Sequence, residues 1–296
     1  MLTHGHVQPV APARVVVMGA GGFVGGAIVQ ALAARKVPVL GLARADVDLQ
    51  APGAAEKLTA LLRPDDAFVA VSAIAPVKNL AMLKDNLTII EALAGALKAR
   101  PVAHVLNIGS DAIYGDSEKP MSEAGPTAPG SLHGVMHLTR ELALAEAAGA
   151  APFATLRPTL IYGAADPHDG YGPNKFRRLA KAGQEIVLFG EGEERRDHVH
   201  VGDVAELAAR ILMHHSRGAL NAATGTVVSF REIAELVVAQ FPAPVAIKGS
   251  PRRGPMPHNG YRAFDPAATK AAFPDFAYLQ PAAGFALVHR LMLEMA

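Results

Sequence analysis

The segment from Val15 to Gly25, with the sequence VVVMGAGGFVG, constrains the fold of this chain more than any other stretch. An apolar run that resembles a buried strand leads into three glycines at three-residue spacing and then into a helix-forming pattern. The first glycine permits a tight turn, the second lets a phosphate approach the backbone, and the third lets the helix pack closely on the strand. The free N–H groups at the start of such a helix bind a pyrophosphate, so the segment predicts a dinucleotide site. Its predicted cofactor-binding residues are Gly19, Gly22, Phe23, Val24 and Gly25.

Apolar runs alternate with helical patterns from Arg14 to about Val204, which is typical of a parallel sheet with helices on both faces. The predicted strands are Arg14–Met18, Val37–Ala43, Ala67–Ser72, His104–Ile108, Ala154–Leu156 and Ala219–Asn221. The predicted helices are Phe23–Arg35, Gly53–Leu62, Val77–Arg100 and Leu132–Gly149. The predicted fold class is therefore α/β, a Rossmann-like doubly wound parallel sheet with a smaller C-terminal substrate lobe.

A change in composition after Tyr162 predicts that smaller lobe. Residues 164–197 are rich in glycine, proline and charge, and Val245–Pro266 is again rich in proline and glycine. Doubly wound sheets bind their ligands at the carboxyl ends of the strands, and we expect the lobe to lie over that edge. The predicted organisation is a dinucleotide-binding domain over 13–163, to which 198–224 return, and a discontinuous substrate lobe over 164–197 and 225–296.

The end of the second predicted strand bears on the choice between NAD and NADP. An acidic residue there binds the ribose hydroxyls of NAD, whereas an arginine suits the 2′-phosphate of NADP. Arg44 is nearer to the strand end than Asp48, which favours NADP over NAD as the cofactor. A solvated Arg44 paired with Asp46 is the alternative.

The bulk composition excludes several other classes of protein. The formal net charge is +1 and the basic residues are scattered, so we expect no nucleic-acid partner and no membrane partner. The absence of cysteine excludes disulfides, thiolate metal sites and thiol catalysis. The apolar stretches are strand-sized, and residues 1–13 lack the pattern of a signal peptide. We therefore expect a cytoplasmic protein in which residues 1–13 form a frayed lead-in.

Beyond the glycine loop, a series of motifs resembles the extended short-chain dehydrogenase/reductase family over nearly the whole chain. The motifs are Val69–Ala73, Asn86, Ile108–Gly115, Arg157-Pro158 with Tyr162-Gly163, and Arg196–Val204. The resemblance implies that Ser72 and Ala73 lie beside the cofactor and that Ser110 is the catalytic serine. The short connection Asp46–Leu49 looks most like the 4-keto-6-deoxysugar reductase branch. A dehydratase would have a glutamate where Ala112 stands, which counts against dehydration.

The family pattern breaks at two positions. In the family a Tyr-x-x-x-Lys pair performs the acid/base step, and the lysine lowers the tyrosine pKa from about 10 towards neutrality. Here His133 replaces the tyrosine and His137 replaces the lysine, while Gly134 and Glu141 fit the pattern. Because the two histidines are four residues apart in a predicted helix, their side chains share one face.

Several interpretations of His133 and His137 stay open. In the first, His133 exchanges the proton, since its ordinary pKa of about 6.5 already lies near neutrality, and a neutral His137 binds the cofactor ribose. Ser110 would then orient the substrate oxygen, with Asp111 as a reserve acid. In the second, the protein binds a dinucleotide without catalysis, as a sensor. In the third the pair ligates a metal, and in the last both rings are simply buried and hydrogen-bonded.

The substrate side is less determined by the sequence. Asn174 and Arg196 resemble positions that grip a substrate diphosphate, and arginine suits such bidentate contacts. Thr159–Ile161, however, lacks the asparagine that nucleotide-sugar members carry shortly after Arg-Pro. The resemblance also implies a homodimer through the helices predicted over 77–100 and 132–149.

These observations predict an NAD(P)-dependent oxidoreductase or epimerase-like enzyme. Its substrate would be a small molecule with a carbonyl or secondary alcohol, sugar-like and phosphate- or nucleotide-linked. His133 would be its unusual acid/base group, and no metal is expected. The alternative is a non-catalytic NAD(P)-binding or sensor protein of the same fold.

Overall fold

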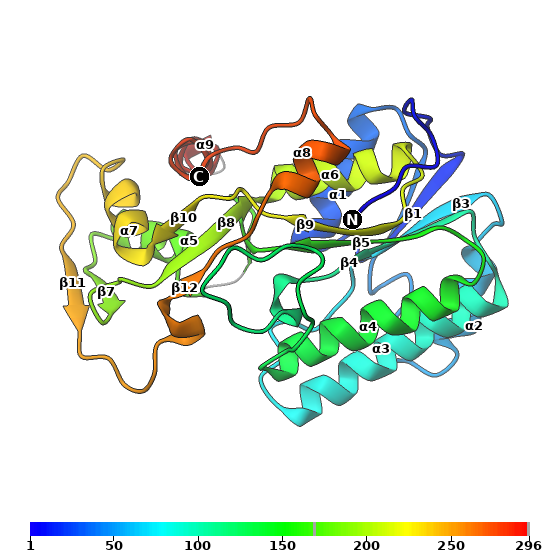
Figure 1. Cartoon of the computed structure of the whole chain (residues 1–296), viewed down its shortest axis with the longest axis horizontal. Helices are drawn as coiled ribbons and strands as arrows, with labels where there is room; N and C mark the ends of the chain where they lie inside the picture. The colour runs from blue at the N-terminus through cyan, green and yellow to red at the C-terminus, as the bar shows by residue number, and fades with distance from the viewer. Residues whose placement is uncertain (168–169, 295–296) are drawn as a thin grey trace.

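A six-stranded parallel sheet forms the centre of the protein, in a computed structural model that describes residues 1–167 and 170–294 (Figure 1). The strand order is β2-β1-β3-β4-β5-β9, so the order reverses at β1, which pairs with β2 on one side and β3 on the other. The strands are β1 (Arg14–Met18), β2 (Val39–Leu42), β3 (Asp66–Ala70), β4 (His104–Ile108), β5 (Phe153–Pro158) and β9 (Gly218–Ala222). Ligands bind such sheets at the point of reversal, next to the carboxyl end of β1.

Helices cover both faces of this sheet (Figure 1). On one face lie α1 (Phe23–Ala34) and α6 (Val201–Met213), and on the other lie α2 (Ala54–Leu61), α3 (Leu80–Ala99) and α4 (Leu132–Ala148). Because side chains alternate along a strand, Val15 and Val17 pack in the first core and Val16 and Met18 in the second. The prediction of a doubly wound α/β fold is confirmed.

The observed helix ends follow from capping. The predicted helix over 77–100 begins only at Leu80, because the Asn79 side chain accepts a hydrogen bond from the Met82 backbone N–H and caps the helix there. In α4, Ser131 accepts from Gly134 N at 3.2 Å, and the helix ends before Gly149, which has a φ of 58°. Glycine adopts that left-handed conformation without steric cost.

A second lobe packs around its own apolar core, which includes Tyr162, Phe176 and Phe230. It contains a mixed sheet in which β6 (Leu160–Tyr162), β10 (Val227–Ser229) and β12 (Tyr261–Arg262) all pair with β8 (Arg195–His200). The remaining elements of the lobe are β7 (Ile186–Phe189) paired with β11 (Ile247–Ser250), α5 (Pro173–Lys181), α7 (Phe230–Val238), η2 (Pro257–Gly260) and α9 (Pro281–Glu294). A further helix, α8 (Ala267–Ala272), lies beside β9, and a short turn, η1 (Asp111–Ile113), follows β4.

The predicted division into domains stays a prediction. Its segments 164–197 and 225–296 include positions 168–169 and 295–296, which lie outside the described residues. Within residues 1–167 and 170–294, no helix is both long and apolar enough to cross a membrane.

The expectation of a frayed lead-in over residues 1–13 is wrong. Thr3 forms a β-bridge with Arg217, and the ring of His4 lies 2.7 Å from the Ser216 hydroxyl through Nδ1. The backbone N–H groups of Gly5 and His6 both donate to the carbonyl of His214 at 3.0 Å. The segment is therefore held against the turn between α6 and β9.

Candidate active site

A cavity of about 1160 Å³ lies at the carboxyl ends of the central strands and extends to the second lobe. The structure brings most of the predicted site residues to its wall. They are Gly19, Gly22, Phe23, Val24, Gly25, Arg44, Asp48, Ser72, Ala73, Ser110, Asp111, His133, His137 and Arg196. A cavity of this size exceeds what most small ligands need and suits a dinucleotide together with a second molecule.

The glycine loop has the geometry that phosphate binding requires. Gly19 has a φ of 105°, and a Cβ there would lie 2.9 Å from the backbone nitrogen of Ser72. A Cβ on Gly25 would collide with the carbonyl oxygen of Gly19, so the close approach of α1 to β1 depends on glycine. No side chain caps the N-terminus of α1 at Gly22. Its N–H groups are therefore available to a pyrophosphate.

At the end of the cavity that follows β2, the acidic side chains are held by the backbone while the arginine extends into solvent. Asp46 accepts from Ala43 N at 2.8 Å, and Asp48 accepts from Gln50 N at 3.1 Å. The Arg44 side chain is 74% exposed and lies 3.3 Å from the Asp48 carboxylate. An exposed pair of this kind is weak, and a phosphate can replace the carboxylate as the partner of Arg44.

The loop after β3 is tied down by Asn86, which is almost fully buried on α3. Its side-chain oxygen accepts from Ile74 N at 2.9 Å, and its amide nitrogen donates to the carbonyls of Ile74 at 3.0 Å and Met82 at 2.8 Å. The motif asparagine thus positions the wall formed by Ser72 and Ala73 rather than facing a ligand itself.

The two histidines of α4 lie together, with ring centroids 4.6 Å apart and the rings nearly perpendicular. His137 is buried, and its Nδ1 has no hydrogen-bond partner within the described residues. Burial, together with the charges of Arg140 and His133, lowers the pKa of His137 well below its ordinary value. The Nδ1 atom itself is buried, whereas the ring as a whole lines the cavity.

His133 is half-buried and faces the same cavity. Burial lowers its pKa, the negative charge of Asp111 opposes this effect, and the positive charge of Arg140 adds to it. The Nδ1 atom lies 3.5 Å from the backbone nitrogen of Val77, which is the outer limit of a hydrogen bond. That contact is too long to commit the ring to one tautomer.

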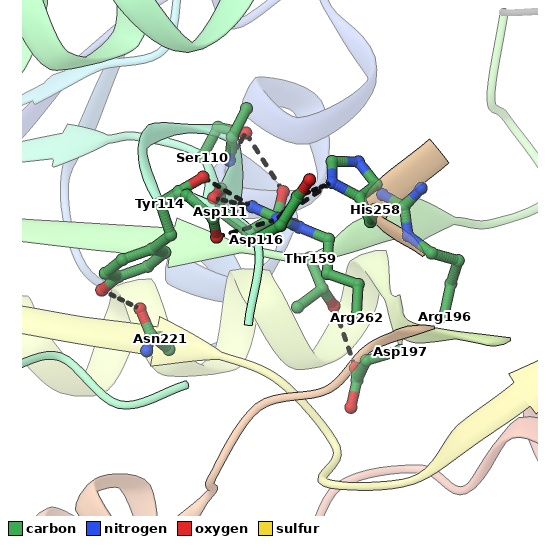
Figure 2. A network of polar contacts seen from close by, with 12 residues as sticks. Ser110, Asp111, Tyr114, Asp116, Thr159, Arg196, Asp197, Asn221, His258 and Arg262 are labelled. Atoms are coloured by element: carbon green, nitrogen blue, oxygen red, sulfur yellow. Dashed lines mark hydrogen bonds and ion pairs between the residues drawn. The ribbon is translucent and has the colours of Figure 1, made fainter. Parts of the chain in front are cut away.

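Ser110 and Asp111 form the turn that follows β4 (Figure 2). The Ser110 hydroxyl accepts from Ala112 N at 3.1 Å, and Ser110 is partly exposed to the cavity. Asp111 is buried and forms an ion pair with Arg262, whose Nε donates to Oδ2 at 2.8 Å. The Asp111 carboxylate is thus engaged by Arg262, which opposes a role for Asp111 as a reserve acid.

The cavity wall also includes charged and titratable side chains that the sequence analysis did not single out, among them Arg140, His258 and Arg262. Figure 2 shows Arg262 from β12 reaching Asp111, with His258 and Arg196 nearby. The Nδ1 atom of His258 contacts Asp116 Oδ1 at 2.5 Å. One feature of the sequence could have indicated Arg262. The dipeptide Tyr261-Arg262 interrupts a segment that is otherwise rich in proline and glycine, as a short strand would.

One predicted substrate-binding residue, Asn174, lies away from the cavity wall. Asn174 is buried, and its amide nitrogen donates to Gly163 O and Asp166 Oδ2, both at 2.9 Å. Its role in substrate binding stays a prediction. His198 is fully buried, and His200 accepts from Gly202 N to cap α6.

Asp197, the acidic residue of the Arg196-Asp197 motif, has a structural role. Asp197 accepts from Thr159 Oγ1 at 3.0 Å (Figure 2). It also accepts from Thr224 N at 3.0 Å and Gly225 N at 2.8 Å, which joins β8 to the loops after β5 and β9. Among the residues that the structure describes, no group of three or more His, Cys, Asp or Glu side chains is placed to hold a metal ion.

Comparisons with known proteins agree with this geometry. The model of the NAD dependent epimerase/dehydratase family matches residues 15–223. The dTDP-4-dehydro-6-deoxy-D-allose reductase of Streptomyces bikiniensis is 30% identical over 278 residues, which cover 81% of this chain and 84% of that protein.

Two solved structures show the same fold. UDP-N-acetylglucosamine 4-epimerase from Bacillus cereus superimposes with a TM-score of 0.80 at 20% identity, over 95% of this chain and 96% of that one. UDP-glucose 4-epimerase from Thermus thermophilus, in complex with NAD, gives a TM-score of 0.79 at 24% identity, over 94% of this chain and 99% of that one.

Proposed function

Because the chain belongs to the NAD-dependent epimerase/dehydratase family of extended short-chain dehydrogenases/reductases, we propose that it transfers hydride at a carbonyl or secondary alcohol of a nucleotide-linked sugar. Membership confirms the family resemblance drawn from the motifs. The observation that carries the proposal is that one cavity holds the glycine loop, Ser110 and the pair of His133 and His137. A cofactor on the glycine loop, a substrate oxygen at Ser110 and the titratable ring of His133 can therefore meet in this cavity.

The residues of the cavity fit a nicotinamide dinucleotide. Gly19, Gly22 and Gly25 would bind the pyrophosphate, and the neutral ring of His137, which lines the cavity, would contact the cofactor ribose. The bound cofactor supplies the hydride acceptor or donor. The protein's own residues supply orientation and proton transfer.

His133 would exchange the proton with the substrate oxygen, which Ser110 would hold by a hydrogen bond. In alcohol oxidation the carbon loses a hydride and the hydroxyl proton passes to the neutral imidazole of His133. Reduction reverses both transfers, and a protonated His133 is then the donor. Tyr114 is not suited to this role. Its hydroxyl donates to Asn221 Oδ1 at 2.8 Å and accepts from Arg157 at 2.6 Å, and burial raises its pKa.

We favour NADP over NAD, because Arg44 extends into solvent while the nearby carboxylates are engaged with the backbone. A 2′-phosphate beside Arg44 would gain a charge-assisted contact that a ribose hydroxyl cannot. The resemblance of Arg196 to diphosphate-gripping positions supports a nucleotide-linked substrate, and Arg196 lines the substrate end of the cavity.

A homodimer through α3 and α4 accompanies this proposal. Both helices expose large apolar side chains, namely Leu80, Leu87, Val135 and Leu142. Apolar side chains on a pair of neighbouring helices suit a second copy of the same pair about a two-fold axis. Light scattering would measure the mass in solution, and Leu142→Glu should then shift it towards the monomer. A wild-type protein that stays monomeric at high concentration excludes the dimer.

The cofactor is tested on the protein as purified. Denaturation followed by mass spectrometry identifies any retained nucleotide, and the emptied protein is titrated with NADPH and NADH by nicotinamide fluorescence, since the chain has no tryptophan. We expect tighter binding of NADPH and loss of that preference in Arg44→Ala. Failure of both nucleotides to bind would exclude the proposal.

Catalysis is tested with a panel of nucleotide-linked 4-keto sugars and their alcohols. We expect the turnover number to fall at least about a hundredfold in His133→Phe, because general acid/base catalysis typically accelerates a reaction by about that factor or more. The matched control is His6→Phe, which removes an exposed histidine outside the cavity. Tight cofactor binding without turnover, and no response to His133→Phe, would instead favour the sensor.

A further inference from the structure

Arg140 is a fully buried cation in the wall of the cofactor cavity. Its side chain comes from α4 and is 1% exposed. The guanidinium donates through Nη1 to the carbonyl of Ser72 at 3.0 Å and through Nη2 to the carbonyl of Ile108. Its Nε has no hydrogen-bond partner within the described residues.

No carboxylate forms an ion pair with Arg140 in the part of the chain that the structure describes. The neighbouring Glu141 is engaged by Arg157, whose Nε donates to it at 3.0 Å, and Asp111 is engaged by Arg262. Burial lowers the pKa of Arg140 to about 10, so it stays charged at neutral pH. Burying an unpaired charge costs stability. The two carbonyls need only a hydrogen-bond donor, which a neutral side chain could also supply.

The position of Arg140 on α4 directs its charge at the histidines. Side chains on a helix lean towards its N-terminus, so Arg140 projects back over the preceding turn, where His137 lies three residues earlier. His133 is one further turn along the same face. Burial is the largest cause of the lowered pKa of both rings, and the positive charge of Arg140 adds to it, while at His133 the charge of Asp111 opposes it.

We propose that Arg140 is the fixed cation of this active site, a positioning residue that anchors α4 to the Ser72 and Ile108 carbonyls and holds its positive charge on the helix face that carries His133 and His137. This inference rests on the proposed function and deepens it. The family places a lysine at the position of His137, and that charge is missing here. Arg140 supplies a cation from one turn further along the helix, fixed by the Ser72 and Ile108 carbonyls.

A neutral His133 has a defined consequence for the reaction. Its lone pair can accept the proton of a substrate hydroxyl while the carbon gives up its hydride, so the site is set for alcohol oxidation at neutral pH. The groups that act on His133 are Asp111 from η1, His137 and Arg140 from α4, and the backbone N–H of Val77. Asp111 opposes Arg140, and Arg262 partly compensates Asp111.

The test is an NMR titration of the histidine ring protons in the intact protein, which does not depend on turnover. The His133 signal is assigned by its loss in His133→Gln. In Arg140→Gln we expect the His133 midpoint to move to higher pH, because removal of a nearby cation favours the protonated ring. In Arg140→Lys, which keeps the charge, we expect the midpoint of the wild type.

Arg14→Gln is the matched control for loss of an inward-facing arginine. Arg14 pairs with the buried Asp66 at the amino end of β1, at the edge of the sheet opposite the cavity. The Arg14→Gln variant should be less stable than the wild type but should have the same His133 midpoint. If Arg140→Gln does not fold, Arg140→Met takes its place, and an unchanged His133 midpoint in that folded variant overturns the inference. An upward shift in Arg140→Lys would refute the role of charge.

Kinetics give the second readout once a substrate is known. For alcohol oxidation, kcat/KM should fall as the pH drops through the His133 midpoint, and this fall should occur at higher pH in Arg140→Gln than in Arg140→Lys. Both variants should lose about tenfold or more in kcat through imperfect placement of α4. An unchanged His133 midpoint in folded Arg140→Gln overturns the inference, whereas absence of turnover with a shifted midpoint counts only against the proposed function.

Discussion

Two buried histidines, His104 and His198, make the stability of the fold depend on pH. Burial lowers the pKa of His104 to about 4 and that of His198 to about 3, against about 6.5 in an unfolded chain. As the pH falls, the unfolded chain therefore binds these protons before the folded chain does. Their contribution to stability is complete above about pH 6.5 and is lost as the pH falls towards the folded-state values.

We predict a free energy of unfolding that declines below pH 6.5 by up to about 1.4 kcal/mol per pH unit for each such histidine. His104→Gln should flatten this slope, because glutamine does not titrate and can still donate to the Ser216 carbonyl that the His104 ring contacts at 2.6 Å. Urea unfolding at a series of pH values measures the slope. Equal slopes in the two proteins would show that His104 does not titrate on unfolding.

The roles of some single residues could be predicted from the sequence, and those of others could not. The glycines and the His133 and His137 pair belong to local motifs, and local motifs can be recognised without the fold. Arg140 was missed because a helical arginine usually faces solvent. Its two carbonyl partners lie 68 and 32 positions away in the chain, so only the folded chain reveals them.

At the scale of elements, α4 is the helix that carries His133, the proposed proton-transfer group. Its start packs directly on η1, because a Cβ at Gly134 would collide with the carbonyl oxygen of Ala112 and lie 2.8 Å from the Cβ of Pro129. The close contact keeps His133 near Ser110, which immediately precedes η1. Glycine at this position is therefore a packing requirement of the site.

We predict that Gly134→Ala displaces the start of α4 and costs about 1–3 kcal/mol of stability, as overpacking does elsewhere. The substrate turnover should fall more than cofactor binding, since the glycine loop of α1 is unaffected. Gly170→Ala, where an added Cβ meets no atom within 4 Å, is the matched control. Thermal unfolding and kcat/KM measure the two effects, and wild-type values for both in Gly134→Ala would contradict this account of the contact.

At the scale of the whole molecule, a buried ion pair joins the two lobes at the active site. Arg262 comes from β12 of the second lobe and is 1% exposed. Besides its pair with Asp111, it donates to the Asp111 carbonyl at 2.6 Å. The turn that carries Ser110 is thus held by both lobes.

Removing one partner of the Arg262–Asp111 pair should lower the free energy of unfolding more than removing both. We predict that Arg262→Met costs about 3–5 kcal/mol, because Asp111 is left charged and buried. The double variant Arg262→Met with Asp111→Asn should recover part of the loss, which a double-mutant cycle of unfolding free energies measures. Additive losses would mean that the two side chains do not interact.

The amino-acid sequence by itself determined the doubly wound sheet, the cofactor loop and the unusual histidines. These features arise from contacts and periodicities within a few residues, such as the glycine spacing at 19, 22 and 25. Capping and packing shifted only the ends of the elements, as at Asn79.

Tertiary structure alone decided what surrounds the reacting groups. It brought Arg140 under the histidines, joined Arg262 to Asp111 across the lobes, and packed residues 1–13 against the turn before β9. Burial, charge pairing and hydrogen bonding to distant carbonyls depend on which segments meet in space. No local pattern carries that information, because the same arginine is a solvated side chain in one fold and a buried cation in another.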